Sequence, residues 1–190
     1  MVKAELRNLY KEKRKTLSRD EVLSLSDRIF SNFISFFKPK SGDKIHLFLS
    51  IKKFNEVDTS RFIHYCWENG ISVYVPKMND DVLISIELTP KTQLVEHSWG
   101  ILEPESNEDS GVSDFDYVIT PLLYADSKGN RVGYGKGFYD QLFSTLPDTC
   151  LKVGVNFFPP KEDVDNVWEN DVPLDYLVLP TEVVSFTGCV

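Results

Sequence analysis

Residues 129–140, GNRVGYGKGFYD, hold three of the ten glycines of the chain in alternate positions, at Gly133, Gly135 and Gly137. Glycine accepts positive φ and lets backbone N–H groups come close to a ligand. Successive N–H groups in such a turn form a concave anion site. Arg131 and Lys136 add a planar guanidinium and a mobile ammonium, which suit phosphoryl oxygens. The stretch therefore predicts a phosphate-binding loop.

The residues on either side place this loop between a strand and a helix. Residues 116–121, DYVITP, precede it and are rich in strand-forming side chains, whereas residues 138–143, FYDQLF, follow it with helical spacing. The loop would then lie at a helix N-terminus, where the helix dipole favours anions. The glycine spacing matches neither the P-loop nor the dinucleotide fingerprint. A glycine-rich surface turn is therefore the alternative interpretation.

Strands and helices alternate along the rest of the chain. Apolar periodicity predicts helices over 2–17, 19–37 and 59–69, and strands over 44–50, 71–76, 83–88, 151–156 and 174–179. This order predicts an α/β fold: a single domain over residues 1–190, built as a three-layer sandwich with a mostly parallel, Rossmann-like sheet and helices on both faces. Ligands of such sheets bind beyond the carboxyl ends of the strands. We expect Ser50, Pro76, Thr120 and Asn156 to face one cleft there.

The composition is that of an ordinary globular protein, with 42% hydrophobic and 26% charged residues in 190. A net charge of −8 argues against a general nucleic-acid binder. No stretch approaches the roughly 18 apolar residues that span a bilayer, and the charged start of the chain lacks a signal core. The three cysteines form no CxxC pair. We therefore expect a cytoplasmic monomer with neither membrane nor nucleic-acid partners.

The first helix is basic, although the chain is acidic. The first 19 residues contain seven Lys or Arg and two Glu. Lys3, Arg7, Lys11 and Arg14 form a stripe beside an apolar one. This pattern permits a solvated helix face, a surface for membranes or nucleic acid, or a source of cations for a phosphate site elsewhere in the fold. The residues alone leave these interpretations open.

The groups suited to chemistry are carboxylates rather than nucleophiles. The histidines lack metal-ligand spacing, and no hydrolase signature is present. Mg²⁺ bound with a nucleotide takes one or two carboxylates plus phosphate oxygens, and Asp140 and Asp171 are candidates. Asp140 is equally an ion-pair partner on a helix turn, and Asp171 by itself is better explained as a turn residue.

Other candidates could bind a flat organic ligand. Glu56 precedes a helix and is either an exposed charge or a group that reaches into the cleft. Trp99 and Tyr134 could stack on a heteroaromatic ring, although Trp99 is equally well explained as a core residue.

Residues 131–140 resemble the signature of the 5-formyltetrahydrofolate cyclo-ligase family, also called methenyltetrahydrofolate synthetases. The resemblance continues, in the order of that family, through KAELR (3–7), FLS (48–50), EVDT (56–59), WGILEP (99–104) and ND (170–171). It implies a single α/β domain that converts 5-formyltetrahydrofolate and ATP to 5,10-methenyltetrahydrofolate, ADP and phosphate with Mg²⁺. Two departures are a longer loop over 51–55 and Asn170, where many relatives carry histidine.

Carried over by position, the resemblance assigns a role to each site residue. Lys3 and Arg7 would contact the phosphates of ATP. The nucleotide site would be lined by Arg131, Val132, Gly133, Tyr134, Gly135, Lys136, Gly137, Phe138 and Tyr139. The residues Tyr134 to Phe138 would also face the folate, Leu49 and Glu56 would contact its pterin, and Trp99 would cover the ring. Asp140 and Asp171 would hold magnesium, and Arg131, Lys136 and Tyr139 would be catalytic.

The implied chemistry agrees with the residues found. Phosphoryl transfer needs positioning and charge neutralisation more than a protein nucleophile. Two other functions remain possible from the residues. One is a sugar-phosphate isomerase or acyl-CoA transferase relative on a similar scaffold. The other is a non-catalytic phosphate- or RNA-binding module that uses the basic helix, for which binding would weaken steeply with salt.

Overall fold

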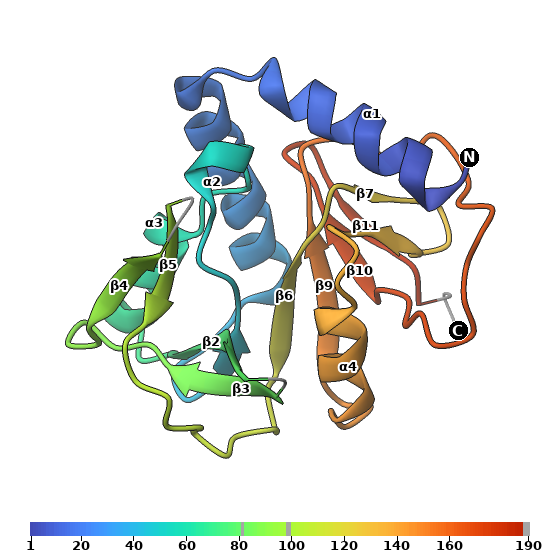
Figure 1. Ribbon diagram of the computed structural model, residues 1–190. Coiled ribbons are helices and arrows are strands. Elements are labelled where there is room, and N and C mark those ends of the chain that lie inside the picture. The colour runs from blue at the N-terminus through green and yellow to red at the C-terminus, as the bar shows by residue number, and fades with distance from the viewer. Residues whose placement is uncertain (81, 98–99, 188–190) are drawn as a thin grey trace.

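The computed structural model describes residues 1–80, 82–97 and 100–187. Its centre is a seven-stranded sheet in the order β11-β10-β9-β6-β1-β2-β3 (Figure 1). The inner strands are parallel: β10 (Tyr176–Val178), β9 (Leu151–Val155), β6 (Tyr117–Pro121), β1 (Lys44–His46) and β2 (Ser72–Asn79). The edge strands β3 (Val82–Glu87) and β11 (Val183–Ser185) are antiparallel to their neighbours.

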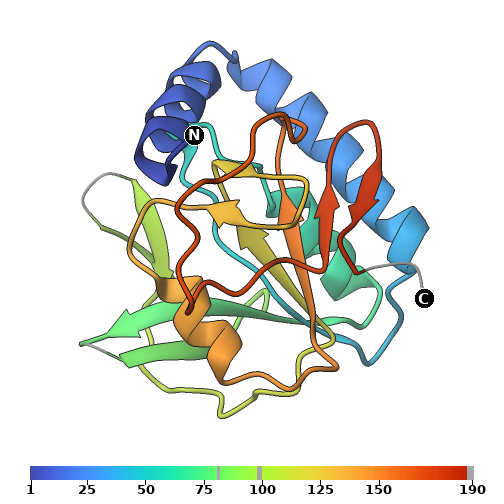
Figure 2. The ribbon, with the colours of Figure 1, turned by 90° about the vertical axis from the view of Figure 1, so that its right-hand side faces the viewer.

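Helices cover both faces of this sheet (Figure 2). The helices α2 (Arg19–Phe37) and α3 (Ser60–Glu68) pack on one face, where Phe33 and Phe62 join strand residues such as Ile119 in the larger hydrophobic core. The short helix α4 (Phe138–Ser144) packs on the other face, where Leu142 joins Val118. Successive residues of β6 thus point to opposite faces, as a strand buried on both sides requires. The predicted α/β fold with helices on both faces is confirmed.

The first helix, α1 (Lys3–Lys15), belongs to neither layer. It lies across the carboxyl edge of the sheet, against the hairpin of β7 (Tyr124–Ala125) and β8 (Arg131–Val132) and the short helix η1 (Lys52–Phe54). It buries Leu6, Tyr10 and Arg14, and the Tyr10 ring stacks on Tyr124 with 4.5 Å between centroids. Burial of this stripe fixes α1 at the position where ligands of parallel sheets bind.

Local signals set the helix boundaries. A capping box is present at the start of α2, because Ser18 Oγ accepts a hydrogen bond from the Glu21 N–H and the Glu21 carboxylate accepts one from the Ser18 N–H. The end of α3 is followed by Gly70 with φ of 68°, a left-handed conformation that favours glycine.

Two predicted strand ends are wrong. The strand predicted over 44–50 stops at His46, because the next residues turn toward α3, where Phe48 O accepts a hydrogen bond from Thr59 Oγ1. The strand predicted to end at Pro76 continues to Asn79, paired with β3. Since β1 has already left the sheet at this level, the missing N–H of Pro76 removes no ladder bond.

Several short strands were not predicted. One pair is β4 (Leu94–His97) with β5 (Ile101–Pro104). The others are the hairpin β7/β8 and the edge strand β11. The hairpin lies between β6 and the glycine loop, so the loop follows β8 rather than a strand of the main sheet. Each of these strands has two to four residues, too few to give a periodic signal. Among the described residues, no helix combines the length and apolar character needed to cross a membrane.

Gly154 on β9 tests the packing of the sheet. An added Cβ would lie 2.6 Å from Leu174 Cδ1 and 2.8 Å from Leu122 Cδ2, so Gly154→Ala should lower the free energy of unfolding by about 1–3 kcal/mol through overpacking. Gly133→Ala is the control, because no described atom lies within 4 Å of its added Cβ. Urea denaturation of both variants measures the difference. Equal stability would contradict the packing described for β9.

Candidate active site

The N-terminal helix and the glycine loop are in direct contact. Arg7 Nε donates a hydrogen bond to Gly133 O at 2.9 Å, across 126 residues of sequence. An added Cβ at Gly135 would lie 3.3 Å from Arg7 Nη2, and the φ of 96° at Gly135 disfavours other residues. The loop backbone thus wraps closely around a guanidinium. This contact supports the interpretation that α1 supplies cations to the loop.

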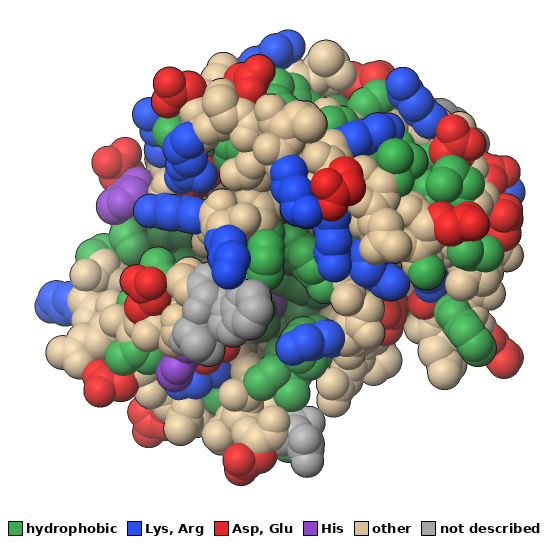
Figure 3. All heavy atoms as spheres, turned by 45° about the horizontal axis from the view of Figure 1, so that its top comes forward, with side chains coloured by type: hydrophobic (Ala, Val, Ile, Leu, Met, Phe, Trp, Pro, Cys, Tyr) green, Lys and Arg blue, Asp and Glu red, His purple; other side chains and the backbone are tan. Residues whose placement is uncertain are grey.

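A second contact ties α1 to the segment before β10. Lys3 Nζ forms an ion pair with Asp171 Oδ2, and the side chains of both residues are largely buried. The backbone N–H of Lys3 also donates to Asn166 Oδ1 at 2.7 Å. Figure 3, which looks toward α1, shows Lys and Arg side chains spread around a hollow with a hydrophobic floor. The structure therefore brings Lys3, Arg7, the glycine loop and Asp171 together, as the sequence predicted.

Arg131 has a different environment from the one expected for a phosphate contact. Its guanidinium pairs with Asp140 at 2.5 Å, donates to Val172 O, and lies 4.7 Å from the centre of the Phe143 ring. The side chain is 8% exposed. Burial lowers the pKa of Arg131, and the adjacent Asp140 opposes that shift. Arg131 thus joins α4 to the segment before β10, and the ion-pair interpretation of Asp140 is the one observed.

Asp140 and Asp171 are the two candidate ligands for Mg²⁺. The described residues contain no cluster of three or more His, Cys, Asp or Glu suited to a metal ion. Asp140 uses Oδ1 for Arg131 and the Val172 N–H, and Asp171 uses Oδ2 for Lys3 and the Trp168 N–H. The described residues give the second oxygen of each carboxylate no hydrogen bond. Two carboxylate oxygens match the protein share of a nucleotide-bound Mg²⁺ site, so the donor set fits.

The remaining loop residues divide into exposed and buried groups. Lys136 is exposed, with Nζ 5.7 Å from the centre of the Phe138 ring. Val132 is buried against Leu6 of α1. The Tyr139 hydroxyl is buried and has no hydrogen-bond partner among the described residues. Burial and the nearby Glu56 carboxylate raise the pKa of Tyr139, so its phenol keeps a proton to donate.

Glu56 reaches into the protein rather than into solvent. It is 4% exposed, accepts a hydrogen bond from the Ile51 N–H at 2.7 Å, and interacts with the nearby Tyr134 hydroxyl. Burial raises the pKa of Glu56, whereas the Ile51 N–H and Arg14 lower it. The longer 51–55 loop thus supports the carboxylate. Leu49 is partly buried beside the larger core, and Trp99 lies outside the described residues.

The sequence placed Arg14 in the basic stripe and Asn156 at a strand end facing the cleft, but it gave neither residue a specific role in the site. Arg14 is 2% exposed, and its Nη2 donates to Asn156 Oδ1 at 3.2 Å and to Leu122 O. The spacing Leu6, Tyr10, Arg14 assigns Arg14 to the apolar stripe, and this signal could have separated it from the exposed cations. Thr120 and Asn156 do lie at neighbouring strand ends, as predicted.

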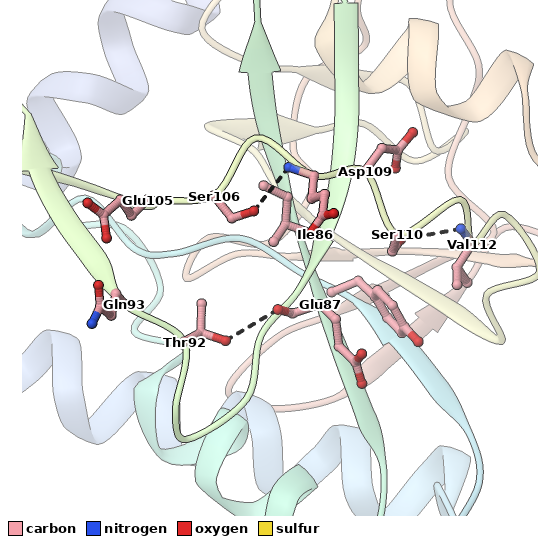
Figure 4. Close-up of a pocket in the computed structure, with 11 residues that line it drawn as sticks. Ile86, Glu87, Thr92, Gln93, Glu105, Ser106, Asp109, Ser110 and Val112 are labelled. Carbon is pink, nitrogen blue, oxygen red and sulfur yellow. Dashed lines mark hydrogen bonds between the residues drawn. The ribbon is translucent and has the colours of Figure 1, made fainter.

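Two hollows differ in their relation to these residues. A small cavity of about 160 Å³ opens beside Tyr134, lined also by Lys11, Lys15, Lys53, Phe54, Asn55 and Leu123. A larger one of about 730 Å³ lies along the edge strand β3 (Figure 4) and contains none of the predicted site residues. Its lining includes the acidic side chains Glu87, Glu105, Glu108 and Asp109. Such a lining would repel an anionic ligand, whereas the smaller cavity is lined by lysines and adjoins Tyr134 of the glycine loop.

Known proteins resemble this chain in both sequence and fold. The family model described as the 5-formyltetrahydrofolate cyclo-ligase family matches residues 1–180. The 5-formyltetrahydrofolate cyclo-ligase of Haemophilus influenzae is 29% identical over 76% of this chain and 80% of its own. Among solved structures, the 5,10-methenyltetrahydrofolate synthetase of Aquifex aeolicus is 29% identical with a TM-score of 0.80, covering 100% of this chain and 95% of its own.

The corresponding synthetase from Mycoplasma pneumoniae is 25% identical with a TM-score of 0.70, covering 94% of this chain and 98% of its own. The resemblance noted in the sequence is therefore confirmed over nearly the whole chain. The chain belongs to the 5-formyltetrahydrofolate cyclo-ligase family.

Proposed function

We propose that this chain catalyses the ATP- and Mg²⁺-dependent cyclisation of 5-formyltetrahydrofolate to 5,10-methenyltetrahydrofolate, with release of ADP and phosphate. The observation that carries the proposal is the contact of Arg7 with the glycine loop at Gly133, in a chain whose family acts on this substrate. That contact places cations and glycine N–H groups together, as a triphosphate site requires.

The two substrates would bind on either side of Tyr134. The nucleotide half comprises Lys3, Arg7 and the loop from Arg131 to Tyr139, and the folate half comprises Leu49 and Glu56. Tyr134 belongs to the glycine loop, and its hydroxyl interacts with the nearby Glu56 carboxylate. The side chain therefore links the two halves, which supports a geometry in which the formyl group faces the terminal phosphate.

In the proposed reaction, the formyl oxygen attacks the γ-phosphorus of ATP, and the bond to the bridging oxygen breaks as ADP leaves. N10 then attacks the formyl carbon and loses its proton, and the C–O bond breaks to release phosphate. The chain contributes positioning and charge neutralisation rather than a nucleophile. Lys136 and the loop N–H groups would stabilise the charge on the transferred phosphoryl group, and Arg7 would hold the loop around it.

Magnesium would be held by Asp140 and Asp171. When bound, it supplies positive charge that offsets the charge of the triphosphate. Lys3 and Arg131 already contact these two carboxylates, so they orient the carboxylate groups and limit the repulsion between them. The cytoplasmic location and the monomeric state stay predictions.

The other functions considered from the sequence have less support. A sugar-phosphate isomerase or acyl-CoA transferase would not need ATP, and the family model that matches residues 1–180 is that of the cyclo-ligases. A non-catalytic RNA-binding module would present the basic stripe of α1 to solvent. Lys3 and Arg7 instead contact Asp171 and Gly133, so the stripe faces the site.

A direct assay tests the proposed function. Purified protein is mixed with 5-formyltetrahydrofolate, ATP and Mg²⁺, and the near-ultraviolet absorbance of the methenyl product is followed together with phosphate release. We expect one phosphate per chromophore formed and no product without ATP. Absence of ATP-dependent product would overturn the proposal, and tight, salt-sensitive RNA binding in its place would favour the binding module.

Lys136 is the loop cation to test first, because it is exposed and removing it should leave the fold intact. Lys136→Ala should lower ATP-dependent turnover about a hundredfold, the usual loss when one transition-state charge contact is removed. Lys128→Ala is the matched control. Lys128 lies in the β7/β8 turn, is also exposed, and pairs with Asp163. Steady-state rates of ATP-dependent product formation by both variants measure this difference. Near-normal turnover of Lys136→Ala would exclude the residue from the phosphate site.

The Mg²⁺ requirement tests Asp140. Asp140→Asn should raise the half-saturating Mg²⁺ concentration at least about tenfold, because even changes next to a metal ligand produce such losses. Asp163→Asn is the control, as an exposed aspartate outside the site. Thermal unfolding should accompany the titration, since Asp140 also binds Arg131. If the variant is folded and its Mg²⁺ dependence matches the control, Asp140 is not a metal ligand.

A further inference from the structure

Arg14 is a buried cation that neither the nucleotide site nor the metal site uses. Only 2% of its surface is exposed, and it continues the apolar stripe of Leu6 and Tyr10 on the inner side of α1. A buried guanidinium is costly unless its donors are paired. The partners of the Arg14 guanidinium therefore indicate its role.

The guanidinium of Arg14 joins three segments that are distant in sequence. Nη2 donates to Leu122 O, just after β6, and to Asn156 Oδ1, just after β9. Nη1 lies 3.4 Å from the Tyr134 hydroxyl of the glycine loop. Asn156 is itself fully buried and donates to Leu123 O at 3.3 Å. The planar fork of arginine thus fixes the Tyr134 side chain relative to two central strand ends.

The same guanidinium acts on Glu56 through Tyr134. The Tyr134 hydroxyl accepts a hydrogen bond from Arg14 and interacts with the nearby Glu56 carboxylate, and the positive charge of Arg14 opposes the effect of burial on the pKa of Glu56. The other groups that face Glu56 are the Ile51 N–H, which donates to it, and the Tyr139 phenol. Arg14 is therefore the cation that acts on this carboxylate, and its Nε has no partner among the described residues.

We propose that Arg14 is a positioning residue of the folate site, holding Tyr134 and Glu56 so that the carboxylate accepts hydrogen bonds from the N–H groups of the pterin ring. This inference rests on the proposed function. Arg14 acts through Tyr134 and Glu56 and contacts neither substrate's reacting atoms. Lys3 and Arg7, the proposed nucleotide contacts, lie about two to three turns earlier on α1, and their own partners are Asp171 and Gly133.

Binding measurements without turnover test this role. Titration calorimetry would give the affinities of wild type, Arg14→Met and Lys13→Met for 5-formyltetrahydrofolate and, separately, for ATP with Mg²⁺. Lys13→Met is the matched control, because it removes the same charge from α1 at a side chain that lies over Tyr10. We expect Arg14→Met to bind the folate at least about tenfold more weakly, with ATP affinity changed less than about threefold.

A double-mutant cycle with Glu56→Gln tests the route of the effect. If Arg14 acts through Glu56, the loss caused by Arg14→Met should largely disappear in the Glu56→Gln background, whereas independent roles would add. The affinity of wild type should fall as the pH drops through the pKa of Glu56. In Arg14→Met this fall should begin at a higher pH, because the cation that lowers that pKa is gone.

Arg14→Lys keeps the inference testable if Arg14→Met does not fold. The lysine retains the positive charge but not the planar set of donors of the guanidinium. We therefore expect folate affinity about fivefold weaker than wild type, with the fall in affinity at low pH beginning at the same pH as in wild type. Folate affinity unchanged in the folded Arg14 variants, equal losses for folate and ATP, or full additivity with Glu56→Gln would overturn the proposal. Wild-type protein that binds 5-formyltetrahydrofolate but forms no product would instead count against the proposed function.

Discussion

The structure depends on how α1 closes the carboxyl edge of the parallel sheet. Chain segments that leave parallel strands at one edge carry carbonyl groups that need donors. Arg14 supplies a donor to Leu122 O, just after β6, and Arg7 donates to Gly133 O, just after the β7/β8 hairpin. The buried Leu6 and Tyr10 hold the helix in place while these cationic groups point inward. A single amphipathic helix therefore completes the core and furnishes the charges of the site.

The charges around the site are arranged in compensated pairs. Lys3 pairs with Asp171, Arg131 with Asp140, and Arg14 faces Glu56 by way of Tyr134. Such pairing lets a protein of net charge −8 hold a cationic pocket without leaving buried charges unsatisfied. It also means that each of these residues has a structural as well as a proposed functional role. Substitutions at Arg131 and Asp140 will therefore affect stability together with activity.

Much of the scaffold was predictable because its signals are local. The capping box at Ser18, the glycine after α3 and the periodicity of the buried strands each lie within a few residues of the element they define. The prediction failed at the end of β1 and at Pro76, where the outcome depends on whether a neighbouring strand is still present. It also failed for the two-residue strands of the β7/β8 hairpin, which have no period of their own.

The sequence by itself determined the family and the glycine loop, because the residues of that loop are adjacent in the chain and their chemistry is carried by backbone and side-chain type. It could not decide which acidic group pairs with which cation. Arg7 meets Gly133 across 126 residues and Arg14 meets Asn156 across 142. Only the folding of α1 over the strand ends brings these groups within hydrogen-bond distance. The partners of Arg131 and the burial of Arg14 and Glu56 were decided there, since burial is a property of the packed chain and not of any segment within it.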